Sequence, residues 1–416
     1  MHKSYSIKIL NIFVFLLLYS VFAKAELLLY NSFIVEGQVF DEKYFPVPNV
    51  RIIVSTGGSA VTNLKGEFKV SIETYPYDLV IIDSANSIGV LYQNLTTLKP
   101  ELKLFGAEVP REINSEVIRV DFTPIPSGRS AIIKFLSDEI FYAPDVYASA
   151  GEKSKLLQIN WPANINTING RVIYLEKSQT KYEKLGEKVI SISKGFYPQN
   201  IVFDTLSFYN SPGESMLTIY FPSGSYEKKE LSVFADFLSL HRNAGILLNK
   251  TEGDLITTNV LIPLNLQLGY RLRVKAKMTL KGGAYIENFE YTYPNSTLTI
   301  SREEPPFLIT PQNRFSFVNN NTLFSYEWGS GSGIYVLHFH GFNPVGDYYI
   351  VTIDRTIKSP IAKSFGILKG NEFSWQVRKY IPYISTDDFV KPRKFSNDLG
   401  YKAILYSELW VFNFIR

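Results

Sequence analysis

The chain alternates apolar and polar residues with the period of two that is typical of half-buried β-strands. The clearest case is a hairpin, in which segments 270–280 and 284–293 are joined by Lys281-Gly282-Gly283. Successive side chains of a strand point to opposite faces, so one face of this hairpin should be core and the other should face water. The expected core face carries Leu272, Val274, Ala276 and Met278, and the other carries Arg271, Arg273, Lys275 and Lys277.

Short β-branched and aromatic segments, separated by clusters of Pro, Gly, Asn and Ser, predict strands along the rest of the chain. Between residues 115 and 222 these segments are 117–122, 131–136, 156–161, 171–175, 188–192 and 216–221. Segment 226–249 is ambiguous, because Leu231, Phe234, Leu238 and His241 recur at helical spacing while Leu231, Val233, Ala235 and Phe237 alternate. The flanking segments are all β, which favours a strand there.

The pattern therefore predicts an all-β protein of tandem β-sandwiches. Proline and polar breaks divide it into segment 33–106, an Ig-like sandwich at 115–222, a β-rich domain at 226–302 and a last sandwich at 305–416. The limits of the third domain, between residues 222 and 305, are left open by the sequence.

Residues 1–25 have the pattern of a cleaved signal peptide. Lys3 and Lys8 precede a short apolar run at 9–22, and Ala23-Lys24-Ala25 is a small-x-small cleavage site. The run is shorter than the ~18 to 20 apolar residues that span a bilayer as a helix. We expect a secreted or cell-envelope protein, periplasmic or at the cell surface, with no membrane-spanning helix after removal of the signal.

Composition supports this interpretation. Residues 1–25 hold three lysines and no acid, so the formal charge of the remaining chain falls from +4 to +1. Nucleic acid is an unfavourable partner for such a surface, since phosphate binding needs a concentrated positive field. The chain has no Cys, so its domains must be held together by core burial instead of disulfides.

The N-terminal domain resembles the carboxypeptidase regulatory-like domain, a transthyretin-like sandwich. The resemblance is carried by 35–41 (VEGQVFD), 46–52 (PVPNVRI) and 62–70 (TNLKGEFKV), in this order and spacing. Gly37 is expected to let the first strand bend, and Gly66 to supply a positive φ in the turn that begins at Asn63. The family implies an appendage to peptidases, adhesins and outer-membrane transporters that has no catalytic residues of its own.

The C-terminal domain resembles fibronectin type III. Pro305-Pro306 opens it, and the resemblance rests on 323–328 (LFSYEW), 333–339 (GIYVLHF), 348–353 and 368–377 (LKGNEFSWQV), with 409–414 closing the sheet. The family implies that the first of these strands carries a core tryptophan, here Trp328. Segment 381–400 departs from the family as a longer polar insertion.

Two histidines are the main candidates for metal chemistry. His338 and His340 alternate with Phe339 in a predicted strand, so both imidazoles should point to one face at a spacing that suits a metal. No third ligand is evident nearby, His2 falls in the signal peptide, and His241 is far away in the sequence. The sequence therefore predicts an exposed strand pair, with no metal and no cofactor.

Other motifs are weak. Asp387-Asp388 lacks the alternating oxygen ligands of a calcium loop and is expected to be a solvated turn. The run 329–333 (GSGSG) leads into a strand, whereas a phosphate loop leads into a helix. No catalytic constellation is evident, so no catalytic residue is predicted.

The leading hypothesis is a non-catalytic secreted or envelope-associated protein that binds a protein or a polysaccharide. An extracellular peptidase or glycosidase with accessory sandwiches is the first alternative, and its Asp and Glu would come from segment 115–300. An outer-membrane-associated partner or small barrel is the second, suggested by the aromatic final strand with Trp410, Phe412 and Phe414.

Overall fold

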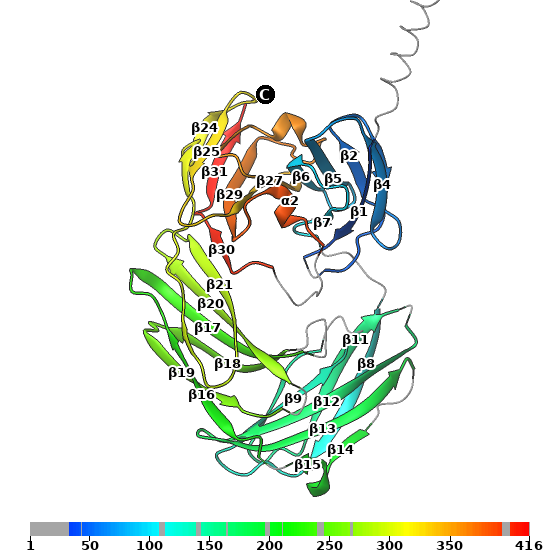
Figure 1. Ribbon diagram of the computed structural model, residues 1–416, viewed down its shortest axis with the longest axis vertical. Helices are drawn as coiled ribbons and strands as arrows, with labels where there is room; N and C mark the ends of the chain where they lie inside the picture. Colours follow the sequence, from blue (N-terminus) through cyan, green and yellow to red (C-terminus); the bar gives the residue numbers. More distant parts are fainter. Residues whose placement is uncertain are drawn as a thin grey trace, which may run out of the picture.

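The computed structural model describes residues 33–415, apart from 43, 108–112, 139–142, 164, 196–199, 210, 239–244, 267–268 and 393–399. The predicted signal peptide, 1–25, and His241 lie outside the described residues. The protein is all-β, as predicted, and its strands form four sandwiches that Figure 1 shows at the corners of a quadrilateral. None of the helices in the described part of the chain has the length and hydrophobicity to cross a lipid bilayer.

The first sandwich packs a three-stranded sheet against a four-stranded one around Val35, Ile52, Val70, Leu79 and Val90. The smaller sheet has the order β4-β1-β7, with β1 (Phe33–Phe40), β4 (Glu67–Ile72) and β7 (Glu101–Lys103). The larger one contains β2 (Arg51–Val54), β3 (Ser59–Val61), β5 (Tyr77–Asp83) and β6 (Ile88–Leu95). Gly66 has φ +73° in the turn before β4, as the sequence predicts.

The second sandwich packs two sheets around Trp161, Phe135 and Phe203, which are all fully buried. One sheet has the order β11-β8-β14, with β8 (Ile113–Phe122), β11 (Ser154–Pro162) and β14 (Asn200–Phe203). The other contains β9 (Ser130–Leu136), β10 (Val146–Ser149), β12 (Thr167–Lys177), β13 (Tyr182–Ser193) and β15 (Phe208–Tyr209), and a short 3-10 helix, η1, covers Thr205–Ser207.

The third sandwich begins earlier in the chain than the pattern predicts. Segment 216–221, expected in the second sandwich, forms most of β16 (Glu214–Tyr220), which pairs with β19 (Thr257–Pro263) and β22 (Thr297–Thr299). The physical reason is burial, since Leu217 and Ile219 pack in the core of the third sandwich. The opposite sheet contains β17 (Tyr226–Phe237), β18 (Gly245–Gly253), β20 (Tyr270–Leu280) and β21 (Tyr285–Thr292), so the strand favoured for the ambiguous segment is confirmed.

The hairpin of β20 and β21 has the predicted buried face. Its other face is not fully exposed to solvent, because the basic side chains there pack on aromatic rings. Leu272, Val274, Ala276 and Met278 are fully buried. On the other face the four basic side chains lie over aromatic rings of neighbouring strands, with 3.9 to 5.3 Å from each cationic centre to the ring centroid. The pairs are Arg271 on Tyr291, Arg273 on Phe234, Lys275 on Phe289 and Lys277 on Tyr285.

The fourth sandwich contains most of the C-terminal quarter. Its outer sheet has the order β23-β25-β28, with β23 (Phe307–Thr310), β25 (Leu323–Glu327) and β28 (Thr356–Lys358). The inner sheet contains β26 (Ile334–Phe342), β27 (Val345–Thr352), β29 (Glu372–Ile381) and β30 (Ala403–Tyr406), and it is extended by β31 (Trp410–Phe414) and β24 (Phe315–Val318). Two short helices complete it, η2 (Ile361–Lys363) and α2 (Thr386–Phe389).

The prediction that Trp328 is the core tryptophan of this sandwich is wrong. Trp328 follows β25 and is 44% exposed, with the Arg355 guanidinium 3.4 Å from the centroid of its ring. Trp375 on β29 is fully buried instead, with Phe324 edge-on at 5.0 Å. The side chain of Trp375 falls on the inner face of β29 together with Phe373 and Val377, whereas Trp328 lies beyond the end of its strand.

Three of the four sandwiches share one sheet. Strand β6 of the first sandwich pairs in parallel with β27 of the fourth, from Asp347↔Ile88 to Val351↔Tyr92. Strand β21 of the third sandwich pairs with β30 of the fourth, which continues the sheet from β18 to β3. The first, third and fourth sandwiches are therefore joined by backbone hydrogen bonds and are not a string of separate modules.

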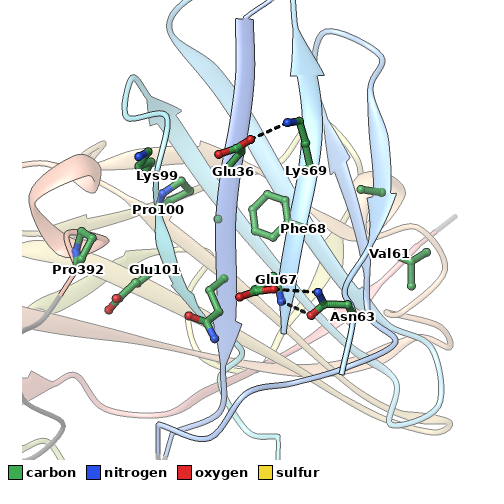
Figure 2. Close-up of a pocket in the computed structure, with 13 residues that line it drawn as sticks. Glu36, Val61, Asn63, Glu67, Phe68, Lys69, Lys99, Pro100, Glu101 and Pro392 are labelled. Atoms are coloured by element: carbon green, nitrogen blue, oxygen red, sulfur yellow. Dashed lines mark hydrogen bonds and ion pairs between the residues drawn. The ribbon is translucent and has the colours of Figure 1, made fainter. Parts of the chain in front are cut away.

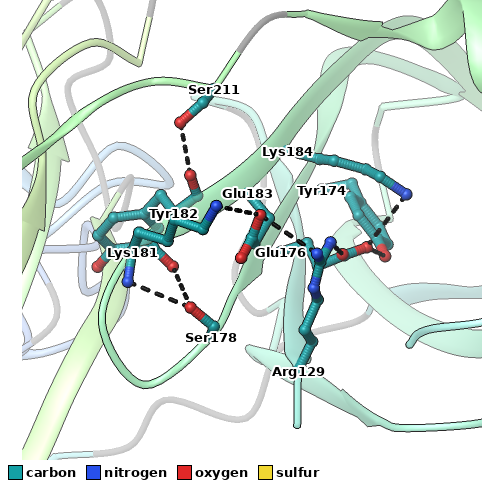
Figure 3. A network of polar contacts seen from close by, with 9 residues as sticks. All are labelled: Arg129, Tyr174, Glu176, Ser178, Lys181, Tyr182, Glu183, Lys184 and Ser211. Carbon is teal, nitrogen blue, oxygen red and sulfur yellow. Dashed lines mark hydrogen bonds and ion pairs between the residues drawn. The ribbon is translucent and has the colours of Figure 1, made fainter. Parts of the chain in front are cut away.

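The second and third sandwiches are joined by side chains. Tyr182 on β13 donates a hydrogen bond from Oη to the Leu261 carbonyl at 2.9 Å, and Lys177 Nζ donates to the Leu248 carbonyl at 3.0 Å. Beside this contact Glu176, whose side chain is 0% exposed, lies 3.0 Å from Arg129 and 3.6 Å from Lys184 (Figure 3). Tyr174 Oη also donates to Glu176, and burial together with that carboxylate raises the pKa of Tyr174.

The Glu176 network is expected to stabilise the second sandwich, because Arg129, Tyr174 and Lys184 all belong to it. Glu176→Gln leaves Arg129 and Lys184 without the buried charge they share, so the free energy of unfolding should fall by about 3 kcal/mol. Glu36→Gln is the matched control, because the Glu36–Lys69 pair is exposed and its loss should change stability far less. Urea denaturation of both variants measures their free energies of unfolding. Equal decreases in the two variants would contradict a stabilising role for the Glu176 network.

Candidate binding cleft and histidine–aspartate cluster

A cleft of about 680 Å³ lies where the first and fourth sandwiches share their sheet. Its floor is formed by consecutive strands of that sheet, with Ile53 from β2, Val80 from β5, Leu91 from β6 and Ile350 from β27. Its walls are β28 and the segment 360–365. A largely apolar concavity of this size is the form that ligand sites commonly take.

The floor is apolar because β5 is buried on both faces. Leu79 and Ile81 face the core of the first sandwich, while Val80 and Ile82 face the core of the fourth. A strand covered on both sides reads as a continuous hydrophobic run. Ile53 and Leu91 lie at the margin of the covered area and are only partly buried, so they remain accessible in the cleft.

A few polar groups converge on this apolar floor. Gln93 Oε1 is buried and has no hydrogen-bond partner among the residues that the structure describes. Lys358 and Lys363 line the wall, and Asp78 accepts a hydrogen bond from the Asn94 amide at 3.0 Å. Buried amide oxygens are normally paired, so a ligand that donates to Gln93 would satisfy this one.

One wall of the cleft is also the edge of a sheet. β28 pairs with β25 on one side, from Leu323↔Lys358 to Ser325↔Thr356. Among the described strands none pairs with its other side. An unpaired edge presents backbone N–H and C=O groups to an incoming extended chain.

A second hollow, of about 580 Å³, lies on the first sandwich, and several charged side chains line it (Figure 2). Its charged groups contact each other, with Lys69 Nζ 2.7 Å from Glu36 and Asn63 Nδ2 2.9 Å from Glu67. Gly37 makes room here for the ring of Phe68, since a Cβ at Gly37 would lie 2.5 Å from that ring. Close packing is thus a role of Gly37 that the sequence analysis did not predict, and the strand bend stays a prediction.

His338 and His340 lie on one face of β26, as predicted, and the structure brings a third potential ligand to them. His338 Nε2 is 2.6 Å from Asp347 Oδ1, and His340 Nδ1 is 2.9 Å from the same oxygen. Asp347 is directly opposite His340 in the pairing of β26 with β27. The sequence analysis missed Asp347, although the hairpin register across the short 343–344 turn was the signal that could have found it.

The surroundings of the cluster bias its protonation. Burial lowers the pKa of His338, the hydrogen bond with Asp347 opposes this, and the positive charge of Arg378 adds to the lowering. Burial acts to raise the pKa of Asp347, but hydrogen bonds with His338 and His340 outweigh it and the pKa is lowered. His338 also stacks on Tyr349, with ring centroids 4.3 Å apart.

Asp387 has a different role from the solvated turn that the sequence predicts. It lies in the single turn of α2 and accepts hydrogen bonds from the amides of Thr96 at 2.8 Å and Thr97 at 3.0 Å. It also accepts from the Thr96 hydroxyl. The carboxylate therefore ties segment 381–392 to the loop after β6, and Asp388 pairs with Lys391 at 2.9 Å.

The glycine-serine run 329–333 surrounds a cation. Lys379 on β29 is fully buried and its ammonium donates to three carbonyls, those of Trp328 at 2.9 Å, Ser330 at 2.7 Å and Gly331 at 2.5 Å. Burial lowers the pKa of Lys379 to about 8, which leaves it charged at neutral pH. The loop is thus a structural lysine cradle, whose carbonyl oxygens face the Lys379 ammonium and would repel a phosphate.

No protein-family model and no curated protein matches the chain. Solved structures that are similar include a tetra-tandem repeat in the extending region of a large adhesion protein. The match has 6% sequence identity and a TM-score of 0.17, and it covers 92% of this chain and 100% of that chain. A putative adhesin from Bacteroides ovatus has 8% identity, coverage of 47% and 94%, and TM-score 0.17.

The Bacillus anthracis TIE protein has 11% identity and TM-score 0.16, and the match covers 65% of this chain and 50% of that one. The match thus spans half the length of the TIE protein.

Lys379 offers a direct test of the cradle. Lys379→Met removes the ammonium and leaves three carbonyls without their donor, so the stability of the protein should fall by about 2 to 3 kcal/mol. Lys391→Met is the control, because the Lys391 side chain is 69% exposed. The midpoints of urea denaturation measure both, and an unchanged midpoint for Lys379→Met would show that the three hydrogen bonds contribute nothing.

Proposed function

We propose that this chain is a non-catalytic interaction protein of the extracytoplasmic space that binds an extended protein segment in the cleft between its first and fourth sandwiches. The observation that carries the proposal is the apolar floor of the cleft beside the unpaired edge of β28. Export through residues 1–25, and attachment to the cell envelope or release, belong to the same proposal.

The lining of the cleft favours a protein over a polysaccharide. Its floor is mainly aliphatic, with Ile53, Val80, Leu91 and Ile350, and the aromatic members of the described lining are Tyr348 and Phe365. An extended peptide can bury alternate side chains against this floor and form backbone hydrogen bonds with β28. Backbone hydrogen bonds between the peptide and β28 would provide affinity, and the fit of the peptide side chains to the floor would provide specificity.

Carboxylates in the segment that a hydrolase would use have structural partners. Glu176 is paired with Arg129 and Lys184, Asp236 accepts from Arg273 at 2.7 Å, and Glu187 accepts from Arg171 at 2.6 Å. These ion pairs support a scaffold function for segment 115–300. We also propose that the first sandwich is carboxypeptidase regulatory-like, on the residues that carry that resemblance.

A peptide-display experiment tests the proposed function. The purified protein is used to select from a phage-displayed library of random twelve-residue peptides, and the binding of enriched peptides is measured by fluorescence anisotropy. Peptides with alternating apolar residues should bind wild type and lose at least about tenfold in affinity for Leu91→Lys, because the cation disrupts the floor. Leu64→Lys is the matched control, since Leu64 is 86% exposed on the same sandwich outside the cleft.

Two results would contradict this function. One is enriched peptides that bind Leu91→Lys as tightly as wild type. The other is no peptide enrichment combined with saturable binding on a glycan array, which would assign the protein to polysaccharide. Thermal melting of Leu91→Lys alongside Leu64→Lys separates loss of binding from loss of fold.

A further inference from the structure

We propose that His338, His340 and Asp347 form a binding site for a divalent transition metal of the zinc class. These three side chains are the group in the described part of the chain whose ligand atoms all lie within 4.8 Å of one another. The site is separate from the cleft, because side chains alternate along β27. Tyr348 and Ile350 face the cleft, while Asp347 and Tyr349 face the opposite side of the sheet.

The strand geometry fixes the three donors. Residues two apart on a strand point to the same face, so His338 and His340 present their imidazoles side by side. The antiparallel pairing puts Asp347 opposite His340 and Tyr349 opposite His338. All three donors are therefore held by neighbouring strands in the interior of the shared sheet, which is a rigid position for a ligand set.

The chemistry of the donors selects the metal class. Two imidazoles and one carboxylate suit Zn²⁺ and similar borderline cations, and do not suit Mg²⁺ or Ca²⁺, which take mostly oxygen ligands. Side-chain exposures of 17% for His338, 30% for His340 and 25% for Asp347 leave one side of the group open to solvent. Three protein ligands with an open fourth position is the arrangement of a site that can also bind water or a partner's side chain.

The present contacts need only a small adjustment to admit the cation. Metal–ligand distances of ~2.0 Å in a tetrahedron separate ligand atoms by roughly 3.3 Å, and the nitrogen–oxygen distances here are 2.6 and 2.9 Å. Both contacts use Oδ1, so rotation of the Asp347 carboxyl group would open the space. The metal would replace the protons that now bridge these atoms.

Arg378 gives this site a distinctive property. Its Nη2 lies 3.4 Å from His338 Nδ1, and its guanidinium lies over the rings of Tyr349 and Tyr406 at 5.7 and 5.5 Å. When Nε2 binds a metal, Nδ1 carries the proton and needs an acceptor, which a guanidinium cannot be. Arg378 should therefore weaken metal binding, and Arg378→Gln, which supplies an amide oxygen, should strengthen it.

The test is metal titration of the full protein prepared without a histidine tag and freed of metal with a chelator. Zn²⁺ binding is followed by isothermal titration calorimetry, and Co²⁺ binding by its visible absorption, which reports the ligands and their geometry. We expect one equivalent of metal to bind. The affinity should fall at least about tenfold in His340→Gln and in Asp347→Asn, and rise in Arg378→Gln.

Asp254→Asn is the control, because the Asp254 side chain is 90% exposed on the third sandwich. Zinc should raise the melting temperature of wild type and of this control, but not that of the double variant His338→Gln/His340→Gln. Absence of Zn²⁺ and Co²⁺ binding by wild type would overturn the proposal. So would binding that the double variant retains with the same stoichiometry and affinity, which would place the metal elsewhere.

Discussion

The parallel pairing of β6 with β27 is the interaction on which the rest of the structure depends. It joins strands that are more than 250 residues apart in sequence, and it turns the first and fourth sandwiches into one body with a common sheet. The antiparallel pairing of β21 with β30 adds the third sandwich to the same sheet. Main-chain hydrogen bonds are directional and regular, so these two junctions hold the sandwiches in fixed orientation where a flexible linker would not.

Sharing a sheet changes what each face of a strand has to bury. The inner face of β5 belongs to the core of the first sandwich and its outer face to the core of the fourth. The fourth sandwich covers this outer face incompletely, because β28 has only three residues and the η2 segment that follows forms a wall of the cleft. The cleft is the part of this outer face that the fourth sandwich leaves uncovered. Its floor is apolar because the same face is core where the two sandwiches meet.

The alternation of apolar and polar residues was sufficient to predict strands and their buried faces, but it could not predict which strands pair when they are far apart in the sequence. The alternation at 270–280 correctly predicted which side chains of β20 are buried, and the alternation at 231–237 correctly favoured a strand. The partners of β16 and of β6 could not be found this way, because any apolar strand edge satisfies the same pattern. Trp328 and Trp375 show the same limit, since both lie in aromatic segments and only the end of β25 decides that Trp328 is left outside the core.

Both proposed sites follow from the alternation of a single strand. Along β27 the residues at 348 and 350 face the fourth core and the cleft, and those at 347 and 349 face the histidines of β26 and the first core. A shift of one residue in the pairing of β26 with β27 would move Asp347 to the opposite face and separate it from both imidazoles. The register that positions Asp347 is fixed on its other side by β6, so the histidine–aspartate cluster and the floor of the cleft are both set by the junction between the first and fourth sandwiches.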